Sequence, residues 1–191
     1  MIIATNNKGK LEEIKKILKE YPLYSLKEKN IQIDVEEDQD TFLGNAKKKA
    51  FEIYNLTKEA TIADDSGLCI KTLDGFPGVM THRFLGNKAT DEERNEYLIN
   101  EVNKCNSREA QVVCELVYYD GNEYIVGEGI LDGFISTTRR GNNGFGFDEI
   151  FELPNGLTLA EVTPLEKNQV SARALAAKDL QKKLGARFGT R

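Results

Sequence analysis

Two long β-forming runs joined by a tight turn constrain the fold of this chain most strongly. The runs are "AQVVCELVYYD" (110–120) and "EYIVGEGILDGFIS" (123–136), and they meet at the turn "DGN". Such a junction predicts a β-hairpin, so part of the sheet is antiparallel. The chain opens differently, with the apolar run "MIIAT" followed by "KGKLEEIKKILKEY" (8–21), whose apolar residues recur at helical spacing. Because hairpin and crossover connections both occur, the sequence predicts an α/β fold with a mixed sheet.

Capping patterns predict where further helices begin. They lie near Asp40-Thr41, at Thr90 and at Thr163, and the last two each have a glutamate three residues later. A threonine followed at that spacing by glutamate is a capping box, which satisfies exposed N–H groups at a helix start. The last pattern is followed by a second possible start at Ser171, so the C-terminal region contains one helix or two.

Composition bounds the class of protein. A chain of 191 residues with 40% hydrophobic and 30% charged residues is typical of one soluble globular domain, here residues 1–191. No apolar stretch has membrane-spanning length, and we see no signal peptide, so we expect a cytoplasmic protein. The net charge of −5 argues against binding to nucleic acid or a membrane surface. Three scattered cysteines and one histidine favour neither a disulfide framework nor a zinc site.

Two adjacent acids, Asp64 and Asp65, follow the apolar run "ATIA" (60–63) and precede "LCIKTL" (68–73). We predict a strand on either side and a turn between them, because Asp-Asp-Ser-Gly is favourable turn chemistry. Burying adjacent carboxylates is costly unless a cation offsets their charge. The acidic pair is therefore either an ordinary turn or a cation site.

A second acidic run, "DVEEDQD" (34–40), precedes the helix predicted near Thr41. Carboxylates without a nearby histidine or cysteine favour a hard cation, Mg²⁺ or alternatively Mn²⁺. One acid from this run and one from the Asp64-Asp65 pair could hold a metal against phosphates, and another could activate water. The alternative for most of the run is that it stabilises the helix through its dipole.

Two stretches are candidates for phosphate binding. The turn "TNNKGK" (5–10) leads from a strand into a helix, where free N–H groups and lysine suit an anion, although it lacks the Walker A spacing. Asn45 and Lys49 are four residues apart and share one helix face, from which they could bind phosphate oxygens. A plain helix cap and a solvated helix face are the alternatives.

A glycine-rich loop and a helix junction are candidates for binding a base. Glycines around Phe145 allow its ring to stand out of the loop "GFGFD" (144–148), where a flat base could stack on it, and Asp148 could accept hydrogen bonds from base nitrogens. Phe147 is expected in the core. Lys167 and Arg173 could donate to a carbonyl oxygen, or could belong to an ordinary helix surface.

Taken in order, six motifs give a specific pattern. "ATNNKGKLEEI", "EEDQDTFLGNAKKKA", "IADDSGL", "GFPGVMTHRF", "RGNNGFGFDEIF" and "EKNQVSARALA" together resemble the house-cleaning inosine/xanthosine triphosphate pyrophosphatases, from residue 2 to about 184. The resemblance implies a two-lobed α/β fold around a long mixed sheet flanked by helices, with the substrate cleft between the lobes, and a homodimer. It implies hydrolysis of ITP, dITP and XTP to the monophosphate and pyrophosphate, which removes these nucleotides from the pool, with Mg²⁺ as cofactor.

The resemblance also implies roles for individual residues. Asp65 is implied as proton acceptor and metal ligand, and Glu37 as the second metal ligand. The implied substrate-binding residues are Thr5, Asn6, Asn7, Lys8, Gly9, Lys10, Asn45, Lys49, Ser66, Phe145, Gly146, Phe147, Asp148, Lys167, Ala172 and Arg173.

The chain departs from the family pattern at a few positions. Ala172 stands where the family has a histidine, and Gly44, Asn143 and Glu149 replace Glu, Gly and Pro. The first departure touches substrate recognition and makes one alternative function conceivable, a nucleotide-binding protein with weak or no turnover. A separate alternative is a metal-dependent phosphatase that releases orthophosphate.

Overall fold

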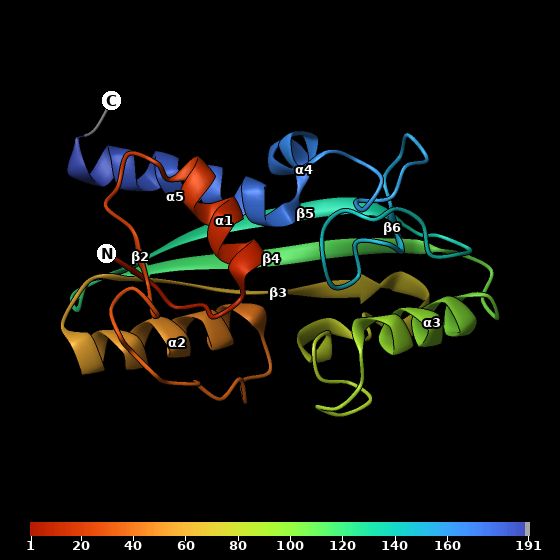
Figure 1. Ribbon diagram of the computed structural model, residues 1–191, viewed down its shortest axis with the longest axis horizontal. Helices are drawn as coiled ribbons and strands as arrows, with labels where there is room; N and C mark the ends of the chain where they lie inside the picture. Colours follow the sequence, from red (N-terminus) through yellow and green to blue (C-terminus); the bar gives the residue numbers. More distant parts are fainter. Residues whose placement is uncertain (190–191) are drawn as a thin grey trace. The chain divides into compact units, whose positions relative to one another are not determined.

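The hairpin predicted from the sequence forms strands β4 (Glu109–Tyr119) and β5 (Tyr124–Ile135) in the computed structural model, which describes residues 1–189 (Figure 1). The other strands are β1 (Ile2–Ile3), β2 (Tyr24–Ser25), β3 (Thr61–Ile70) and β6 (Phe151–Glu152). The sheet order is β2-β1-β3-β4-β5-β6, with β1 parallel to β2 and β3, and β6 antiparallel to β5. The predicted mixed α/β sheet is confirmed.

The helices begin where the capping patterns predict. They are α1 (Lys8–Ile17), α2 (Phe42–Thr57), α3 (Asp91–Val102), α4 (Pro164–Val170) and α5 (Ala172–Phe188), with short 3₁₀ turns at Lys71–Leu73 and Gly78–Met80. Both predicted capping boxes are present at α3 and α4. Ser171 is extended and separates α4 from α5, so the C-terminal region contains two helices. The first helix ends at Ile17 and is shorter than the helical pattern, which continues to Tyr21.

The predicted turn at Asp64 and Asp65 is wrong. Both residues lie inside one continuous strand, β3, and nine of its ten residues are buried. The residues Asp-Asp-Ser-Gly favour a turn when only local interactions count. In the folded protein, ion pairs and hydrogen bonds to other elements compensate the burial of both carboxylates in an extended strand. Tertiary contacts therefore override the local preference.

The chain divides into two compact units, which correspond to the two lobes implied by the resemblance. The first unit contains Met1–Ser66, Cys114–Gly129 and the chain from Ala172 onward, and the second contains Gly67–Val113 and Ile130–Ser171. Strands β3, β4 and β5 each contribute residues to both units.

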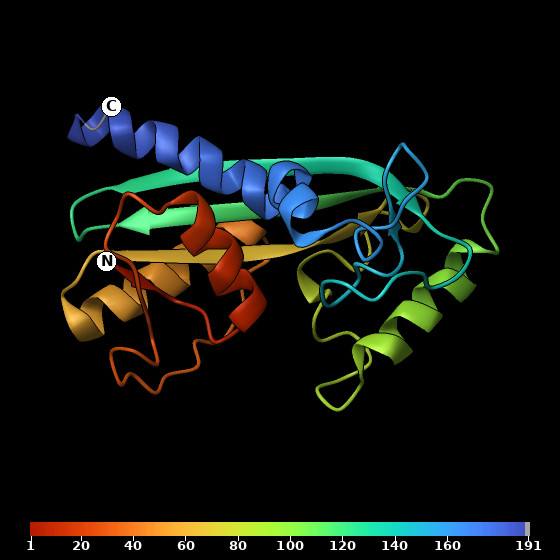
Figure 2. The same ribbon diagram turned by 45° about the horizontal axis from the view of Figure 1, so that its top comes forward.

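In the first unit, helices cover both faces of the sheet (Figures 1 and 2). Helix α2 packs Ala46, Ala50 and Ile53 against one face, together with Ala63 and Val117 of the strands. Helices α1 and α5 lie side by side on the other face (Figure 2). Helix α5 approaches β5 so closely that a Cβ at Gly129 would lie 1.9 Å from the Ala172 carbonyl oxygen, so only glycine fits there.

In the second unit, α3 turns Leu98, Ile99 and Val102 toward the interior, and Phe151 of β6 is fully buried. Among residues 1–189, no helix combines the length and the apolar character needed to cross a bilayer.

A carboxyl pair on the hairpin predicts pH-dependent stability. Burial raises the pKa of Glu115 to about 7, and the hydrogen-bonded Glu128 carboxyl adds to the effect. Lys183 lowers this pKa and Asp179 raises it, both from α5. The folded protein therefore binds more protons than the unfolded chain between about pH 4.5 and 7, so stability should fall as pH rises through this range and then level off.

Thermal unfolding at pH 5 and pH 8 tests this expectation. Glu115→Gln carries no negative charge at this position at either pH. The unfolding midpoint of the variant minus that of wild type should therefore be larger at pH 8 than at pH 5. A difference between the two proteins that stays constant over this range would contradict the shifted pKa.

Candidate active site

Asp64 and Asp65 have different partners because successive residues of a strand point to opposite faces of the sheet. Asp64 meets Lys10 of α1 and Arg173 of α5, on one face. Asp65 meets Asn45 of α2, on the other. One acidic pair therefore serves two clusters with different electrostatics.

The Asp64 cluster is a buried ion network. Asp64 Oδ2 lies 3.1 Å from Lys10 Nζ and 3.3 Å from Arg173 Nε. Arg173 Nη1 also donates to Glu13 Oε2 at 2.9 Å, and Nη2 donates to Ser66 Oγ at 2.8 Å. Burial alone would raise the pKa of Asp64, but the charges of Lys10 and Arg173 outweigh it and hold the pKa far below its usual range. Asp64 is thus a permanent carboxylate.

Asp65 has the opposite character. Its two carboxylate oxygens accept hydrogen bonds from Asn45 Nδ2 at 2.9 Å and from the Ser66 backbone N–H at 2.8 Å. Burial raises the pKa of Asp65 to about 6, and the Glu37 carboxylate adds to the rise while Lys49 opposes it. A carboxylate whose pKa lies near neutrality is suited to accept a proton during a reaction.

Glu37 and Lys49 complete this second cluster. Lys49 Nζ donates to Glu37 Oε1 at 2.6 Å, and the charges of Asp64, Glu37 and Asp65 raise the pKa of Lys49 against the effect of its burial. The ammonium group thus stands among carboxylates that electrostatically favour a cation. Glu37 and Asp65 supply hard oxygen donors, which suit Mg²⁺ or Mn²⁺. Within residues 1–189 no third acidic, histidine or cysteine ligand joins them, so phosphate or water oxygens would complete the coordination.

The predicted phosphate-binding turn is a capped helix N-terminus. Asn7 caps α1 by accepting from the Lys10 N–H, and Thr5 Oγ1 accepts from the Asn7 N–H, both at 3.1 Å. Asn6, Asn7 and Lys8 are exposed, whereas Lys10 is buried on Asp64. The N–H groups and dipole of this helix end suit an anion.

The predicted base-binding residues form a cluster within the second unit. Lys167 Nζ lies 2.6 Å from Asp148 Oδ2 and 4.4 Å from the centre of the Phe145 ring. Asp148 Oδ2 also accepts from the Phe145 N–H at 2.9 Å. A Cβ at Gly144 would lie 2.1 Å from Asp148 Oδ2, so glycine is required for this loop to close on the carboxylate.

Asn95 and Glu13 were not predicted as site residues, and Asp64 was named only as a member of the acidic pair. Asn95 of α3 donates to the Gly146 carbonyl at 2.9 Å and supports the aromatic loop. Asp64 and Glu13 hold Arg173. A signal was present for Glu13, because it lies three residues after Lys10 on the inward face of α1, where an acid is unusual.

Comparison with known proteins identifies the family. The model of the Ham1 family matches residues 1–183. This chain belongs to the Ham1 family. A dITP/XTP pyrophosphatase of Clostridium perfringens is 43% identical over 195 residues, which cover 96% of each chain. Another, from Clostridium tetani, is 38% identical and covers 96% of this chain and 95% of its own. The solved Ham1 protein of Staphylococcus aureus has a TM-score of 0.89 at 35% identity, covering 97% of this chain and 98% of that one.

Ala172, which stands where the Ham1 family resemblance led us to expect histidine, is 1% exposed in this family member. It is the first residue of α5, and its carbonyl faces Gly129. The neighbouring Arg173 directs its guanidinium into the Asp64 network. Contact of either residue with substrate stays a prediction.

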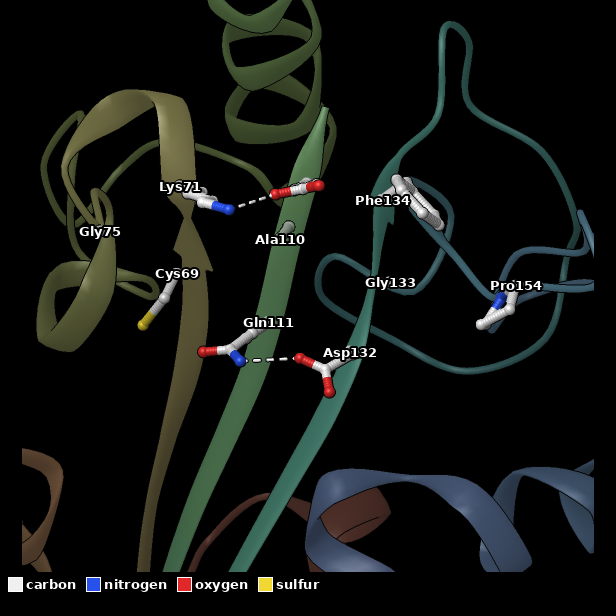
Figure 3. Close-up of a pocket in the computed structure, with 10 residues that line it drawn as sticks. Cys69, Lys71, Gly75, Ala110, Gln111, Asp132, Gly133, Phe134 and Pro154 are labelled. Atoms are coloured by element: carbon white, nitrogen blue, oxygen red, sulfur yellow. Dashed lines mark hydrogen bonds and ion pairs between the residues drawn. The ribbon is translucent and has the colours of Figure 1, made fainter. Parts of the chain in front are cut away.

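A cavity of about 650 Å³ in the second unit contains none of the predicted site residues (Figure 3). It lies on the strands beside Cys69, Gln111 and Asp132, with Phe134 and Pro154 at one side. The predicted Ham1 site residues therefore lie outside this cavity.

Proposed function

We propose that this chain hydrolyses non-canonical purine nucleoside triphosphates (ITP, dITP and XTP) to the monophosphate and pyrophosphate, removing them from the nucleotide pool. The observation that carries the proposal is Asp65, a buried and hydrogen-bonded carboxylate whose pKa is raised to about 6, beside Glu37 and Lys49. The activity named for the relatives from Clostridium perfringens and Clostridium tetani supports the same conclusion.

In the proposed reaction, Asp65 accepts a proton from a water molecule as the water oxygen attacks the α-phosphorus. The bond from the α-phosphorus to the bridging oxygen breaks, and pyrophosphate leaves. Asn45 and the Ser66 N–H hold the carboxylate in place for this transfer. The α1 N-terminus binds phosphate oxygens. Its contribution to catalysis is to position the triphosphate, and it forms no covalent bond with the substrate. Held by Glu37 and Asp65, Mg²⁺ would supply charge neutralisation on the phosphates.

The second cluster suits the base. Phe145 offers a ring for stacking, while Asp148 and Lys167 offer an acceptor and a donor to polar base edges. Inosine and xanthosine carry a C6 carbonyl, which accepts from a lysine. Adenine carries an amino group there, so two donors would face each other and lose their hydrogen bonds.

Rates with ITP, dITP, XTP, GTP and ATP in Mg²⁺ test the proposal. We expect kcat/KM for ITP and XTP to exceed that for ATP, with pyrophosphate as product. Equal rates with ATP would contradict the assigned base cluster. Release of orthophosphate would indicate the phosphatase alternative, and binding without turnover would indicate a nucleotide-binding protein.

Glu37→Gln should raise the Mg²⁺ concentration required for half-maximal rate by roughly tenfold or more, the scale seen when groups around a metal are altered. The amide is a poorer ligand than the carboxylate. Titration of the rate with Mg²⁺ measures the effect. Asp38→Asn is the matched control, because the neighbouring Asp38 pairs with Lys48 at 2.8 Å and should not bind the metal. An equal response of both variants would mean that this acidic run acts only as diffuse charge.

Phe145→Ala should weaken purine nucleotide binding by about 1–3 kcal/mol, the typical contribution of one base stacked on an aromatic ring. Phe147→Ala is the control, since Phe147 lines a small void with Phe84 and Leu98 of the same unit and should mainly lower the unfolding temperature. Binding measured by calorimetry separates the two. If Phe147 governs affinity and Phe145 governs stability, the faces of this loop are reversed.

We further propose that the enzyme is a homodimer, as the resemblance implies, and that it acts in the cytoplasm. Sedimentation at several concentrations tests the dimer, and a monomer at all concentrations would exclude it.

A further inference from the structure

Glu13 is an acid in an unusual place. It lies within α1, is only 7% exposed, and has no role in the reaction proposed above. A buried carboxylate on a helix requires a compensating partner. For Glu13 that partner is Arg173, whose Nη1 lies 2.9 Å away.

The contacts of Arg173 fix the plane of its guanidinium group. Nε approaches Asp64 Oδ2 at 3.3 Å, an oxygen that also meets Lys10 at 3.1 Å. Nη1 donates to Glu13 at a shorter distance, so the planar fork of the guanidinium group is held at a second point. Because the fork is planar, fixing Nε and Nη1 determines where Nη2 points, and it points at Ser66 Oγ, 2.8 Å away.

This contact determines what the Ser66 hydroxyl can do. A serine hydroxyl has one hydrogen to donate and two lone pairs to accept. Arg173 donates to the oxygen, so the serine hydrogen must point to another acceptor. Ser66 follows Asp65 directly in β3, and its own N–H holds the Asp65 carboxylate. The hydroxyl is therefore oriented as a donor on the Asp64 face of β3, where Lys10 of the proposed phosphate-binding turn also lies.

We propose that Glu13 is a positioning residue, which acts through Arg173 to hold the Ser66 hydroxyl as a hydrogen-bond donor to a phosphate group. The assignment of that phosphate to a nucleoside triphosphate rests on the function proposed above. The orientation of Ser66 by Glu13 and Arg173 rests on the geometry alone. Without Glu13, Arg173 loses its second anchor, and its Nη2 no longer holds Ser66 in one orientation.

The test is a double-mutant cycle between Glu13 and Ser66, read out as binding of inorganic triphosphate with Mg²⁺ by calorimetry. Glu13→Ala should raise the dissociation constant by about tenfold, within the range of coupling between residues of one hydrogen-bond network. Glu13→Gln retains an acceptor and should raise it by roughly threefold. In a Ser66→Ala background, either change should have less than about a twofold effect. If Glu13→Ala does not fold, the glutamine variant carries the same comparison. Glu12→Gln, an exposed neighbour, is the control and should bind as wild type does.

An equal effect of Glu13 substitution with and without the Ser66 hydroxyl would overturn the proposal, because Glu13 would then act only on the general structure. Absence of any effect in either background, or no binding of inorganic triphosphate by wild type, would also overturn it. Failure of the proposed function looks different: triphosphate binding and the coupling would persist, but ITP would yield no pyrophosphate.

Discussion

Replacing Asp65 by asparagine should lower kcat for ITP by at least about 10²-fold, the lower end of what a general base contributes. The amide cannot accept the proton from water, and it is a poor ligand for Mg²⁺. The loss should therefore exceed this bound if metal binding also fails. Steady-state rates at saturating ITP and Mg²⁺ measure the effect.

The fold should survive this change. Both carboxylate oxygens of Asp65 accept hydrogen bonds, from Asn45 and from the Ser66 N–H, whereas asparagine has a single acceptor oxygen. One donor is left facing an NH₂ group, at a cost of about 1–3 kcal/mol. An active Asp65→Asn enzyme would remove Asp65 from the mechanism. An unfolded one would show that the acid serves the structure.

Asp64→Asn should have its largest effect on stability. It removes the carboxylate that Lys10 and Arg173 share in a buried network, at 3.1 Å and 3.3 Å. Breaking a buried ion pair from one side leaves an uncompensated charge and typically costs about 3–5 kcal/mol. We expect the free energy of unfolding, measured by urea denaturation, to fall by this amount.

The matched control is Asp38→Asn, which removes an exposed carboxylate paired with Lys48. Exposed ion pairs contribute little, so its urea curve should stay close to that of wild type. If Asp64→Asn were as stable as this control, the Asp64 network would not hold the first unit together.

Local signals in the sequence predicted much of the fold. The hairpin follows from a turn between two β-forming runs, and the starts of α2, α3 and α4 follow from caps whose partners lie within a few residues. Those contacts are encoded locally, so a single sequence reveals them.

The site was only partly predictable. The clusters around Asp65 and Lys167 unite residues that the sequence analysis had named, including Asn45 and Asp148. The turn at the acidic pair was mispredicted because its partners are distant: Arg173 lies 109 residues from Asp64 and 160 from Glu13. Such partners are created by the tertiary fold, and no local pattern specifies them.

Hydrolysis of ITP in water enriched with ¹⁸O tests the central claim most directly, namely that water activated by Asp65 attacks the α-phosphorus. The account predicts that the label appears in inosine monophosphate, that the pyrophosphate is unlabelled, and that Asp65→Asn suppresses the labelled product. Label in the pyrophosphate would place the attack at the β-phosphorus, and labelled orthophosphate would place it at the terminal phosphate. Either result would contradict the mechanism.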